Sequence, residues 1–510
     1  MLYFLCITMY HNHCIMMQIE LDNILDTVKK LNPWFKTAEV PSKFLKPYVR
    51  EELSILKDTM QNNELATLLI GGRRVGKSVL MYQLIDSLIR SGVDPKKILF
   101  VQGDNTILRE NILDKNILSA VIKTYEKYIL DDDLSSVEDT VYIFLDEAQA
   151  LPNWDAEVKN HIDLKYPIKF LISGSSSTKL RQGIQNPLVG RVHVTILSPF
   201  SFRDFIGYES STNALDIPLR EIDELRDEFH ELLKAPNMIK IQEIVNNLTH
   251  VKNSSALVNL FKDYALYGGF PYVVENKDKE DVNKYLRDIL QMTFSKDVLQ
   301  EEQIREPLAF ERLMVNICMN ISGVFKLNSL AEKIGLKDER TVRRYIDYYV
   351  DSHYAFVSLP FSFTNKQETI KSNKKIYSID SGVVNTLLFK NQKDLEKDTA
   401  YMGVIAENIV HNALLRFKQC ASGNIYDSIP HWNNTKTHRE IDFVFETDGQ
   451  IYPVEVKNKD TIREEELLEL DSFLTRKELS GVGFVVTSSL FEKRGTNMLL
   501  VPTPIFSLLL

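Results

Sequence analysis

The chain has 510 residues, of which 44% are hydrophobic and 26% charged, as in an ordinary globular protein. Its formal net charge is −9, from 61 basic and 70 acidic side chains, which excludes binding of nucleic acid through a uniformly basic surface. No stretch reaches the roughly 18–20 apolar residues of a membrane span, so we expect no membrane contact. The length indicates about three or four domains.

The first 17 residues are expected to be an N-terminal extension, because Met16 or Met17 could be the true start. The cysteines show neither metal-ligand nor redox spacing, and we expect reduced thiols in a cytoplasmic protein. These cysteines are Cys6, Cys14, Cys318 and Cys420.

The strongest signal lies in residues 66–78, ATLLIGGRRVGKS, where an apolar run precedes G-x-x-x-x-G-K-S and a helical pattern follows. Strand, glycine loop and helix form the context in which this motif predicts a phosphate-binding P-loop. The loop N–H groups and the helix dipole attract phosphate. Lys77 is expected to reach the β- and γ-phosphates as a catalytic cation, and Ser78 to ligate Mg²⁺. The predicted nucleotide-binding residues of this segment are Gly71, Gly72, Arg73, Arg74, Val75, Gly76, Lys77, Ser78 and Val79.

A second apolar run, VYIFLDE at 141–147, predicts a buried strand that ends in two carboxylates. In a doubly wound sheet this end of a strand borders the crevice where phosphates bind. Asp146 is therefore predicted to help hold Mg²⁺ and nucleotide, and Glu147 to activate the attacking water.

Residues 168–180 predict another strand, and it ends in small polar residues. Ser173, Ser175 and Ser176 lie where a hydroxyl could contact the γ-phosphate, and Ser175 is the predicted nucleotide-binding residue, although Gly-Ser clusters also simply form turns. A charge-stabilising arginine can come from the same chain or from a neighbour in a homo-oligomer. Arg191 is the first candidate and Arg181 the second; both could instead be ordinary surface arginines.

Five short blocks in order, GGRRVGKS, FLDEAQALPNW, LISGSSS, LVGR and LSPFSFRDF, followed by YGGFP at 267–271, resemble the prokaryotic AAA-type P-loop ATPases with a C-terminal domain of unknown function. The resemblance implies ATP rather than GTP as the nucleotide. It also implies that Lys77, Ser78, Asp146 and Glu147 are nucleotide and Mg²⁺ residues. It says little about the biological substrate.

The region after the ATPase part is expected to be helical. Residues 206–300 suit a lid or connector, which could move with nucleotide or be a passive bundle. Residues 301–365 resemble a winged helix-turn-helix, and Arg340, Arg343 and Arg344 on its second helix are candidate DNA contacts. Acidic neighbours dilute that basic face, so a winged helix that packs against protein remains the alternative.

The last region, 366–510, contains a helix with Glu407, a strand with Asp442, and the next strand with Glu455 and Lys457 on one face. The separation of Asp442 and Glu455, 455 − 442 = 13, suits a hairpin. This arrangement resembles PD-(D/E)XK nucleases, in which three carboxylates would bind a second Mg²⁺ or Mn²⁺ and the lysine would position the nucleophile. The alternative is the same fold without cleavage. The chain is expected to close with a helix, a strand and an apolar terminal strand.

The sequence thus predicts an α/β protein: a parallel P-loop sheet (18–205), a helical lid, a winged helix and a restriction-endonuclease-like domain. The predicted activity is Mg²⁺-dependent ATP hydrolysis, coupled to DNA binding or processing. The alternative is an ATP-dependent switch that binds a protein partner and has an inactive nuclease-like domain.

Overall fold

The computed structural model describes residues 21–111, 116–175, 188–213, 215–276, 279–293, 304, 306–363, 374–422, 424, 427–434, 439–476, 479 and 481–510. The chain divides into two compact units. The first contains the chain up to Gly71 and from Gly76 to Leu197, and the second contains Gly72–Val75 and Ser198–Leu510. No helix within the described ranges is both long and apolar enough to cross a membrane.

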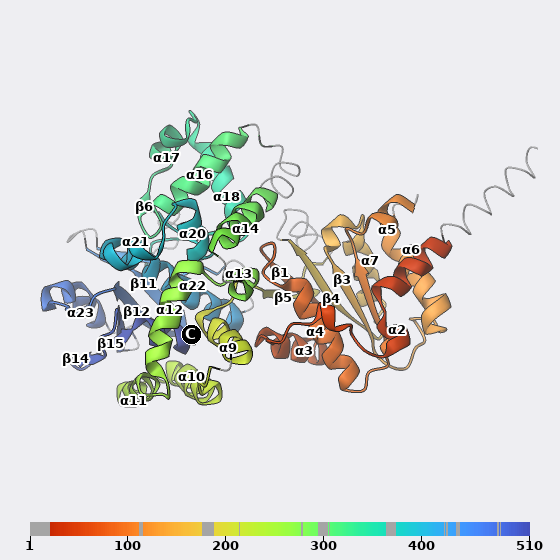
Figure 1. Ribbon diagram of the computed structural model, residues 1–510, viewed down its shortest axis with the longest axis horizontal. Coiled ribbons are helices and arrows are strands. Elements are labelled where there is room, and N and C mark those ends of the chain that lie inside the picture. Colours follow the sequence, from red (N-terminus) through yellow and green to blue (C-terminus); the bar gives the residue numbers. More distant parts are fainter. Residues whose placement is uncertain are drawn as a thin grey trace, which may run out of the picture. The chain divides into compact units, whose positions relative to one another are not determined.

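The first unit contains a parallel sheet of five strands in the order β2-β3-β4-β1-β5 (Figure 1). The strands are β1 Ala66–Gly71, β2 Ile98–Gln102, β3 Val141–Asp146, β4 Ile168–Ser175 and β5 Val192–Ile196. The helices are α2 Trp34–Thr37, α3 Glu52–Asn62, α4 Lys77–Arg90, α5 Thr106–Asn111, α6 Ile117–Tyr125 and α7 Trp154–Asp163. Strands β1 and β3 are buried along their whole length, as their continuous apolar runs predict for a parallel sheet.

The edge strand β2 is covered by side chains from before the sheet. The Asn32 amide donates to the Phe100 carbonyl over 2.9 Å and accepts from the Phe100 N–H over 2.6 Å. The Trp34 indole donates to the Ile98 carbonyl over 2.9 Å. These bonds satisfy backbone groups that an edge strand would otherwise expose for pairing with another chain.

The second unit begins with helices, as the sequence predicts for 206–300, and continues with a small antiparallel sheet in the order β6-β8-β7. Its first helices are α9 Phe202–Asn213, α10 Leu219–Lys234, α11 Met238–Thr249, α12 Ser254–Tyr267, α13 Pro271–Glu275 and α14 Lys279–Met292. The elements around the small sheet are α16 Pro307–Met319, β6 Val324–Phe325, α17 Leu327–Ile334, α18 Glu339–Asp351, β7 Ala355–Ser358 and β8 Lys374–Ser378. Strand β8 lies beyond residue 365 in the chain but pairs with β6 and β7.

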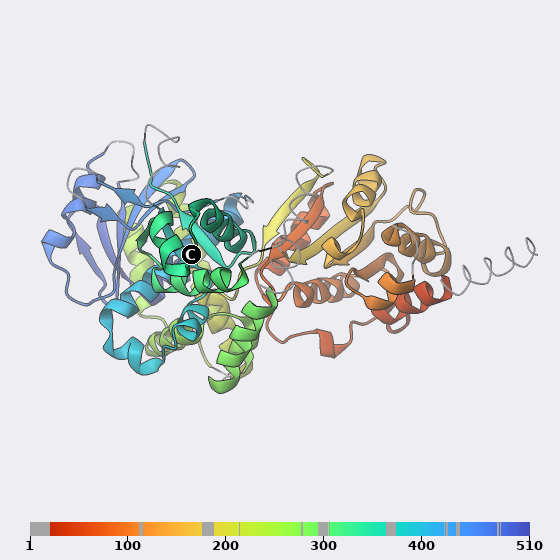
Figure 2. The ribbon, with the colours of Figure 1, turned by 90° about the horizontal axis from the view of Figure 1, so that it is seen from above.

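A mixed sheet of five strands, β11-β12-β13-β15-β14, completes the second unit (Figure 2). Its strands are β11 Phe443–Thr447, β12 Gln450–Lys457, β13 Gly483–Thr487, β14 Glu492–Arg494 and β15 Met498–Pro502; β9 Trp432–Asn433 and β10 Glu440–Ile441 form a separate pair. The remaining helices are α20 Ser381–Leu387, α21 Gln392–Lys397, α22 Thr399–Ser422, α23 Leu468–Leu474 and α24 Thr503–Leu509.

The hairpin predicted between Asp442 and Glu455 is confirmed, because β11 and β12 pair antiparallel around Asp448 and Gly449. Both turn residues have positive φ, 48° and 76°, as a two-residue turn of this twist requires. The sequence predicts one apolar strand at the C-terminus. That prediction is right for β15 but wrong for the residues after it. Pro502 and Pro504 interrupt the apolar run, and α24 follows β15 as a buried helix that begins at Thr503.

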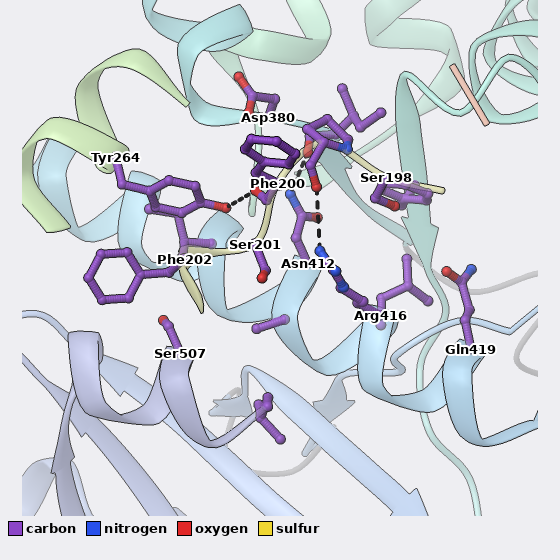
Figure 3. Close-up of a pocket in the computed structure, with 17 residues that line it drawn as sticks. Ser198, Phe200, Ser201, Phe202, Tyr264, Asp380, Asn412, Arg416, Gln419 and Ser507 are labelled. Atoms are coloured by element: carbon purple, nitrogen blue, oxygen red, sulfur yellow. Dashed lines mark hydrogen bonds between the residues drawn. The ribbon is translucent and has the colours of Figure 1, made fainter. Parts of the chain in front are cut away.

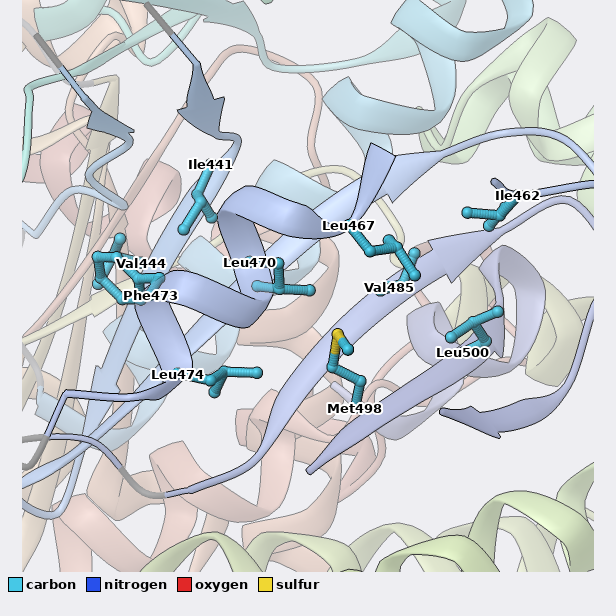
Figure 4. Packing of buried hydrophobic residues seen from close by; sticks show 10 residues of the cluster. All are labelled: Ile441, Val444, Ile462, Leu467, Leu470, Phe473, Leu474, Val485, Met498 and Leu500. Carbon is cyan, nitrogen blue, oxygen red and sulfur yellow. The ribbon is translucent and has the colours of Figure 1, made fainter. Parts of the chain in front are cut away.

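Helix α23 supplies one face of the C-terminal core (Figure 4). Leu470 and Phe473 are at most 2% exposed and pack with Val485 of β13 and Leu500 of β15. A leucine or phenylalanine buried to this degree stabilises the fold by about 1.5–3 kcal/mol.

Three segments that are distant in the sequence cross at the Asp380 carboxylate. Asp380 Oδ2 accepts the Gly269 N–H over 2.7 Å, and the Gly269 carbonyl accepts the Phe200 N–H over 2.7 Å. A Cβ on Gly268 or Gly269 would lie 2.0 Å from Asp380 Oδ1 or the Phe200 carbonyl oxygen, respectively. The sequence blocks SPFSF (198–202) and YGGFP (267–271) therefore lie against each other, and their backbones are too close for a side chain at Gly269.

Helix α22 closes the same crossing (Figure 3). The Tyr264 hydroxyl donates to the Phe200 carbonyl over 3.0 Å, and the Asn412 amide donates to the Ile379 carbonyl over 2.9 Å. Arg416 pairs with the buried Asp204 over 2.7 Å. Only a small cavity, about 40 Å³, remains among these side chains.

We expect Gly269→Ala to lower the free energy of unfolding by roughly 1–3 kcal/mol, because the added methyl group overpacks against backbone. Gly403→Ala is the matched control, since a Cβ at Gly403 on α22 would meet nothing within 4 Å and alanine favours a helix. Chemical denaturation measures both variants. Equal stability of the two would contradict the tight crossing.

Candidate functional site

The P-loop connects β1 to α4 and turns at Gly76, whose φ of 104° suits glycine. Arg74 also has a positive φ, 61°. Lys77 is 6% exposed, and its Nζ donates to the Gly71 carbonyl over 2.9 Å. Its ammonium group is therefore held over the loop, and the first turn of α4 presents the N–H groups that bind phosphate in such loops.

Asp146 at the end of β3 reaches the start of α4. Its Oδ2 accepts the Ser78 hydroxyl over 2.7 Å, and its Oδ1 accepts the Ser173 hydroxyl. Burial raises the pKa of Asp146, while the two serine hydrogen bonds act in the opposite direction. A hydroxyl and a carboxylate oxygen side by side match the hard oxygen ligands that Mg²⁺ prefers, so this pair fits the metal of a nucleotide complex.

Glu147 follows directly, and its backbone adopts a left-handed conformation with φ 49°. Its side chain accepts a hydrogen bond from the Gln149 amide. The glycine at position 103 makes room for this turn, because a Cβ there would lie 2.5 Å from the Glu147 carbonyl oxygen. A non-glycine residue held at positive φ indicates that the surrounding structure enforces the position of Glu147.

The parallel register places the end of β4 beside the P-loop, with Gly71 opposite Ser175 and Leu69 opposite Ser173. The side chain of Ser175, and the whole of Ser176 and Arg181, lie outside the described residues. Ser173, which the sequence places near the γ-phosphate, lies one alternation before Ser175 on the same strand, and its hydroxyl donates to Asp146.

Arg191 lies at the opposite end of the sheet from the P-loop. Its carbonyl accepts the N–H of Ala66, the first residue of β1, whereas the P-loop follows Gly71. Five residues of strand separate these ends by roughly 16 Å, and Arg191 Nε pairs with Asp163 Oδ1 over 2.6 Å. A catalytic role for Arg191 at the nucleotide of its own chain is therefore wrong, and a role at a neighbour's nucleotide stays a prediction.

The three arginines predicted to contact DNA lie on α18, which follows α17 after a turn at Gly335. Arg340, Arg343 and Arg344 are exposed. Arg340 Nε pairs with Asp338 over 3.2 Å, so part of its charge is neutralised within the helix start. Val342, Ile346 and Tyr349 on the other face are buried, as the sequence predicts.

The structure brings the C-terminal candidates together. Asp442 and Glu455 are 7% and 6% exposed, and Glu455 Oε2 accepts the Asp442 N–H over 3.3 Å. Lys457 pairs with Glu455 over 2.6 Å. Glu407 on α22 accepts the Tyr377 hydroxyl over 2.8 Å. Burial and the charge of Asp442 raise the pKa of both Glu407 and Glu455 to about 8.

Sequence reasoning missed Lys375 on β8, which lies among these carboxylates. Its Nζ is 3.6 Å from Glu407, 3.2 Å from Glu440 and 3.5 Å from Asp442. The available signal was strand alternation, which places Lys375 on the same face as the buried Tyr377. In the described part of the chain, no three His, Cys, Asp or Glu side chains are placed to hold one metal ion. The donor set around Lys375 therefore does not fit the predicted second metal.

Comparison with known proteins agrees with this geometry for the first unit. Residues 63–206 match the family model of an AAA domain. Residues 63–206, most of which lie in the first unit, are therefore similar to an AAA domain. Residues 258–394 and 402–506 match two domains of unknown function, DUF8612 and DUF4143.

Two proteins that are similar over most of the chain carry the description "uncharacterized protein". One from Methanocaldococcus jannaschii is 23% identical over 82% of this chain and 81% of its own length. One from Haemophilus influenzae is 22% identical over 80% and 84%. Among solved structures, the Walker-type ATPase of Pyrococcus abyssi aligns over 67% of this chain and 96% of its own at 15% identity, with a TM-score of 0.41. The RuvB branch migration motor of Thermotoga maritima covers 64% and 94% at 14% identity, with a TM-score of 0.25. Both TM-scores are too low for these structures to support any argument about this chain.

The raised pKa of Glu407 predicts a pH-dependent stability. The folded chain binds this proton more tightly than the unfolded chain, so Glu407 makes the wild type less stable as pH rises from about 4.5 to about 8. Glu407→Gln cannot titrate, so its stability relative to wild type should rise across this window. Denaturant unfolding at several pH values measures the difference, with the exposed Glu446→Gln on β11 as control. If the difference in unfolding free energy between Glu407→Gln and wild type does not change with pH, the raised pKa of Glu407 is contradicted.

Proposed function

We propose that the AAA domain hydrolyses ATP with Mg²⁺ and that nucleotide state controls the second unit. The observation that carries this proposal is the 2.7 Å hydrogen bond between Ser78 and Asp146, with Lys77 held on the adjoining loop. The match of residues 63–206 to an AAA domain supports ATP as the nucleotide.

Each residue has a distinct part in this reaction. The P-loop N–H groups and Lys77 bind the β- and γ-phosphates and neutralise the charge that develops on them. Ser78 and Asp146 hold Mg²⁺, which supplies electrostatic stabilisation when it is bound. Glu147 orients the attacking water and accepts its proton. Gln149, which donates a hydrogen bond to Glu147, positions that carboxylate.

For the second unit, the proposed function is DNA binding through α18. The order of three helices and a small antiparallel sheet, α16-β6-α17-α18-β7-β8, supports a winged helix. Helix α18 exposes Arg343 and Arg344 to solvent, where they could contact phosphates. In this form of the proposal, Glu407, Asp442, Glu455 and Lys457 belong to a nuclease-like domain that processes the bound DNA.

The second candidate is a switch that binds a protein partner and does not cleave nucleic acid. Three observations favour it over DNA processing. Lys375 pairs with three carboxylates where the nuclease would need a metal. Asp338 pairs with Arg340 at the start of the proposed recognition helix, and the chain carries a net charge of −9.

We expect Lys77→Ala to lower ATP turnover by at least about 100-fold, because the transferred phosphoryl group loses its cation. Glu147→Gln should retain ATP binding but lower the turnover number by about 100-fold or more, since the amide accepts no proton. Phosphate release and nucleotide-binding assays separate the two effects. Wild-type turnover in either variant would remove that residue from the mechanism.

We expect Arg343→Ala with Arg344→Ala to weaken duplex DNA binding and to lower the salt dependence of the binding constant by about one unit per lost phosphate contact. Arg220→Ala on α10 is the matched control, because Arg220 is also exposed and pairs with Glu224 on its own helix. Fluorescence anisotropy at several salt concentrations measures both. If the wild type shows no salt-sensitive binding, the partner-binding switch replaces the DNA proposal.

A further inference from the structure

Lys375 is the most deeply buried cation of the carboxylate cluster, with a side chain that is 2% exposed. It comes from β8, whose pairing with β7 places Lys375 opposite Ser358 and Tyr377 opposite Phe356. The carboxylates come from other elements, with Glu407 on α22 and Asp442 just before β11. The lysine thus joins the small sheet, the long helix and the C-terminal sheet in one ion-pair cluster.

The position of its ammonium group conflicts with a divalent ion at the same carboxylates. Mg²⁺ needs oxygen ligands at about 2.0–2.1 Å in near-octahedral geometry. The Lys375 Nζ lies 3.2–3.6 Å from Glu440, Asp442 and Glu407. An ammonium group among the same oxygens would repel the metal strongly, because the buried site screens charge poorly.

Further contacts hold the carboxyl groups of the cluster. Asp442 Oδ2 accepts the Val456 N–H over 2.8 Å, and Glu455 pairs with Lys457 over 2.6 Å. The Tyr377 hydroxyl donates to Glu407. Each buried carboxyl therefore has a protein partner, as buried ionisable groups require.

The cluster supplies its own cations. It contains four carboxyl groups and two ammonium groups: Glu407, Glu440, Asp442, Glu455, Lys375 and Lys457. Two lysines therefore already lie against the carboxyl oxygens that a metal would need. The nearby His431 stays neutral, because burial and the charge of Lys375 lower its pKa to about 3.

We propose that Lys375 is the resident cation of this cluster and excludes a divalent metal from it. The C-terminal domain then retains the acidic residues of a metal nuclease, but its own lysine takes the place of the metal. This inference rests on the proposed nuclease-like arrangement of Glu407, Asp442 and Glu455, and it favours recognition over cleavage as the role of this domain.

The test is Mn²⁺ binding by the full chain without nucleotide, followed by electron paramagnetic resonance and by calorimetry. Lys375→Ala should bind one Mn²⁺ per chain more than wild type. Asp442→Asn in the same chain should remove that ion. Lys375→Arg keeps a cation in the cluster and should bind no additional Mn²⁺. Circular dichroism verifies that each variant is folded.

Two results would overturn the proposal. One is a folded Lys375→Ala chain that gains no Mn²⁺. The other result needs no lysine variant. It is an Mn²⁺ ion that binds to the wild-type chain and is lost in the single variant Asp442→Asn. The second comparison keeps the proposal testable if Lys375→Ala does not fold. ATP turnover, measured on the same samples, reports separately on the AAA domain, so a failure of the metal proposal is distinguishable from a failure of the ATPase.

Discussion

The second unit depends on one buried carboxylate, that of Asp380. Burial raises its pKa to about 6, and backbone N–H groups of Gly269, Val383 and Gly382 oppose that rise by stabilising the charged form. A buried carboxylate persists only where such donors surround it. The donors must approach closely, so glycines occupy positions 268, 269 and 382, where a Cβ would lie 2.0 Å from an oxygen atom. The close contacts hold the segments around Phe200, Gly269 and Asp380 together.

A comparable constraint organises the AAA domain. Asp146 is buried and accepts hydrogen bonds from Ser78 on α4 and Ser173 on β4. The carboxylate thus connects three segments at the carboxyl edge of the sheet, the place where open α/β sheets bind ligands. Its position follows from the register of β1, β3 and β4: Leu145 lies opposite Ile172, and the next residue of β4, Ser173, lies opposite Leu69.

The carboxyl groups around Lys375 differ from Asp380 and Asp146, because a buried lysine is their partner. The sequence predicts Glu407, Asp442 and Glu455 as metal ligands, yet a lysine from a different sheet lies against two of them. Strand β8 also holds Lys374, whose pKa is lowered by burial and by Arg343 of α18. Adjacent residues of one strand therefore interact electrostatically with α18 and with the buried cluster, which gives β8 a physical link to both.

The sequence by itself determined the P-loop, the strand that ends in Asp146 and Glu147, the helical region after the ATPase domain and the β11–β12 hairpin. These features depend on local rules: glycine conformation, apolar periodicity and turn residues act within about ten neighbouring positions. Tertiary structure alone decided that Arg191 lies at the far end of the sheet, because strand register is set by partners distant in the chain. It also decided that Pro502 leads into α24, since burial against the rest of the unit overrides the strand-like composition. Above all, it placed Lys375 among carboxylates 32 to 67 residues away (407 − 375 and 442 − 375). No local pattern encodes such a contact, because packing between sheets determines which buried charges meet.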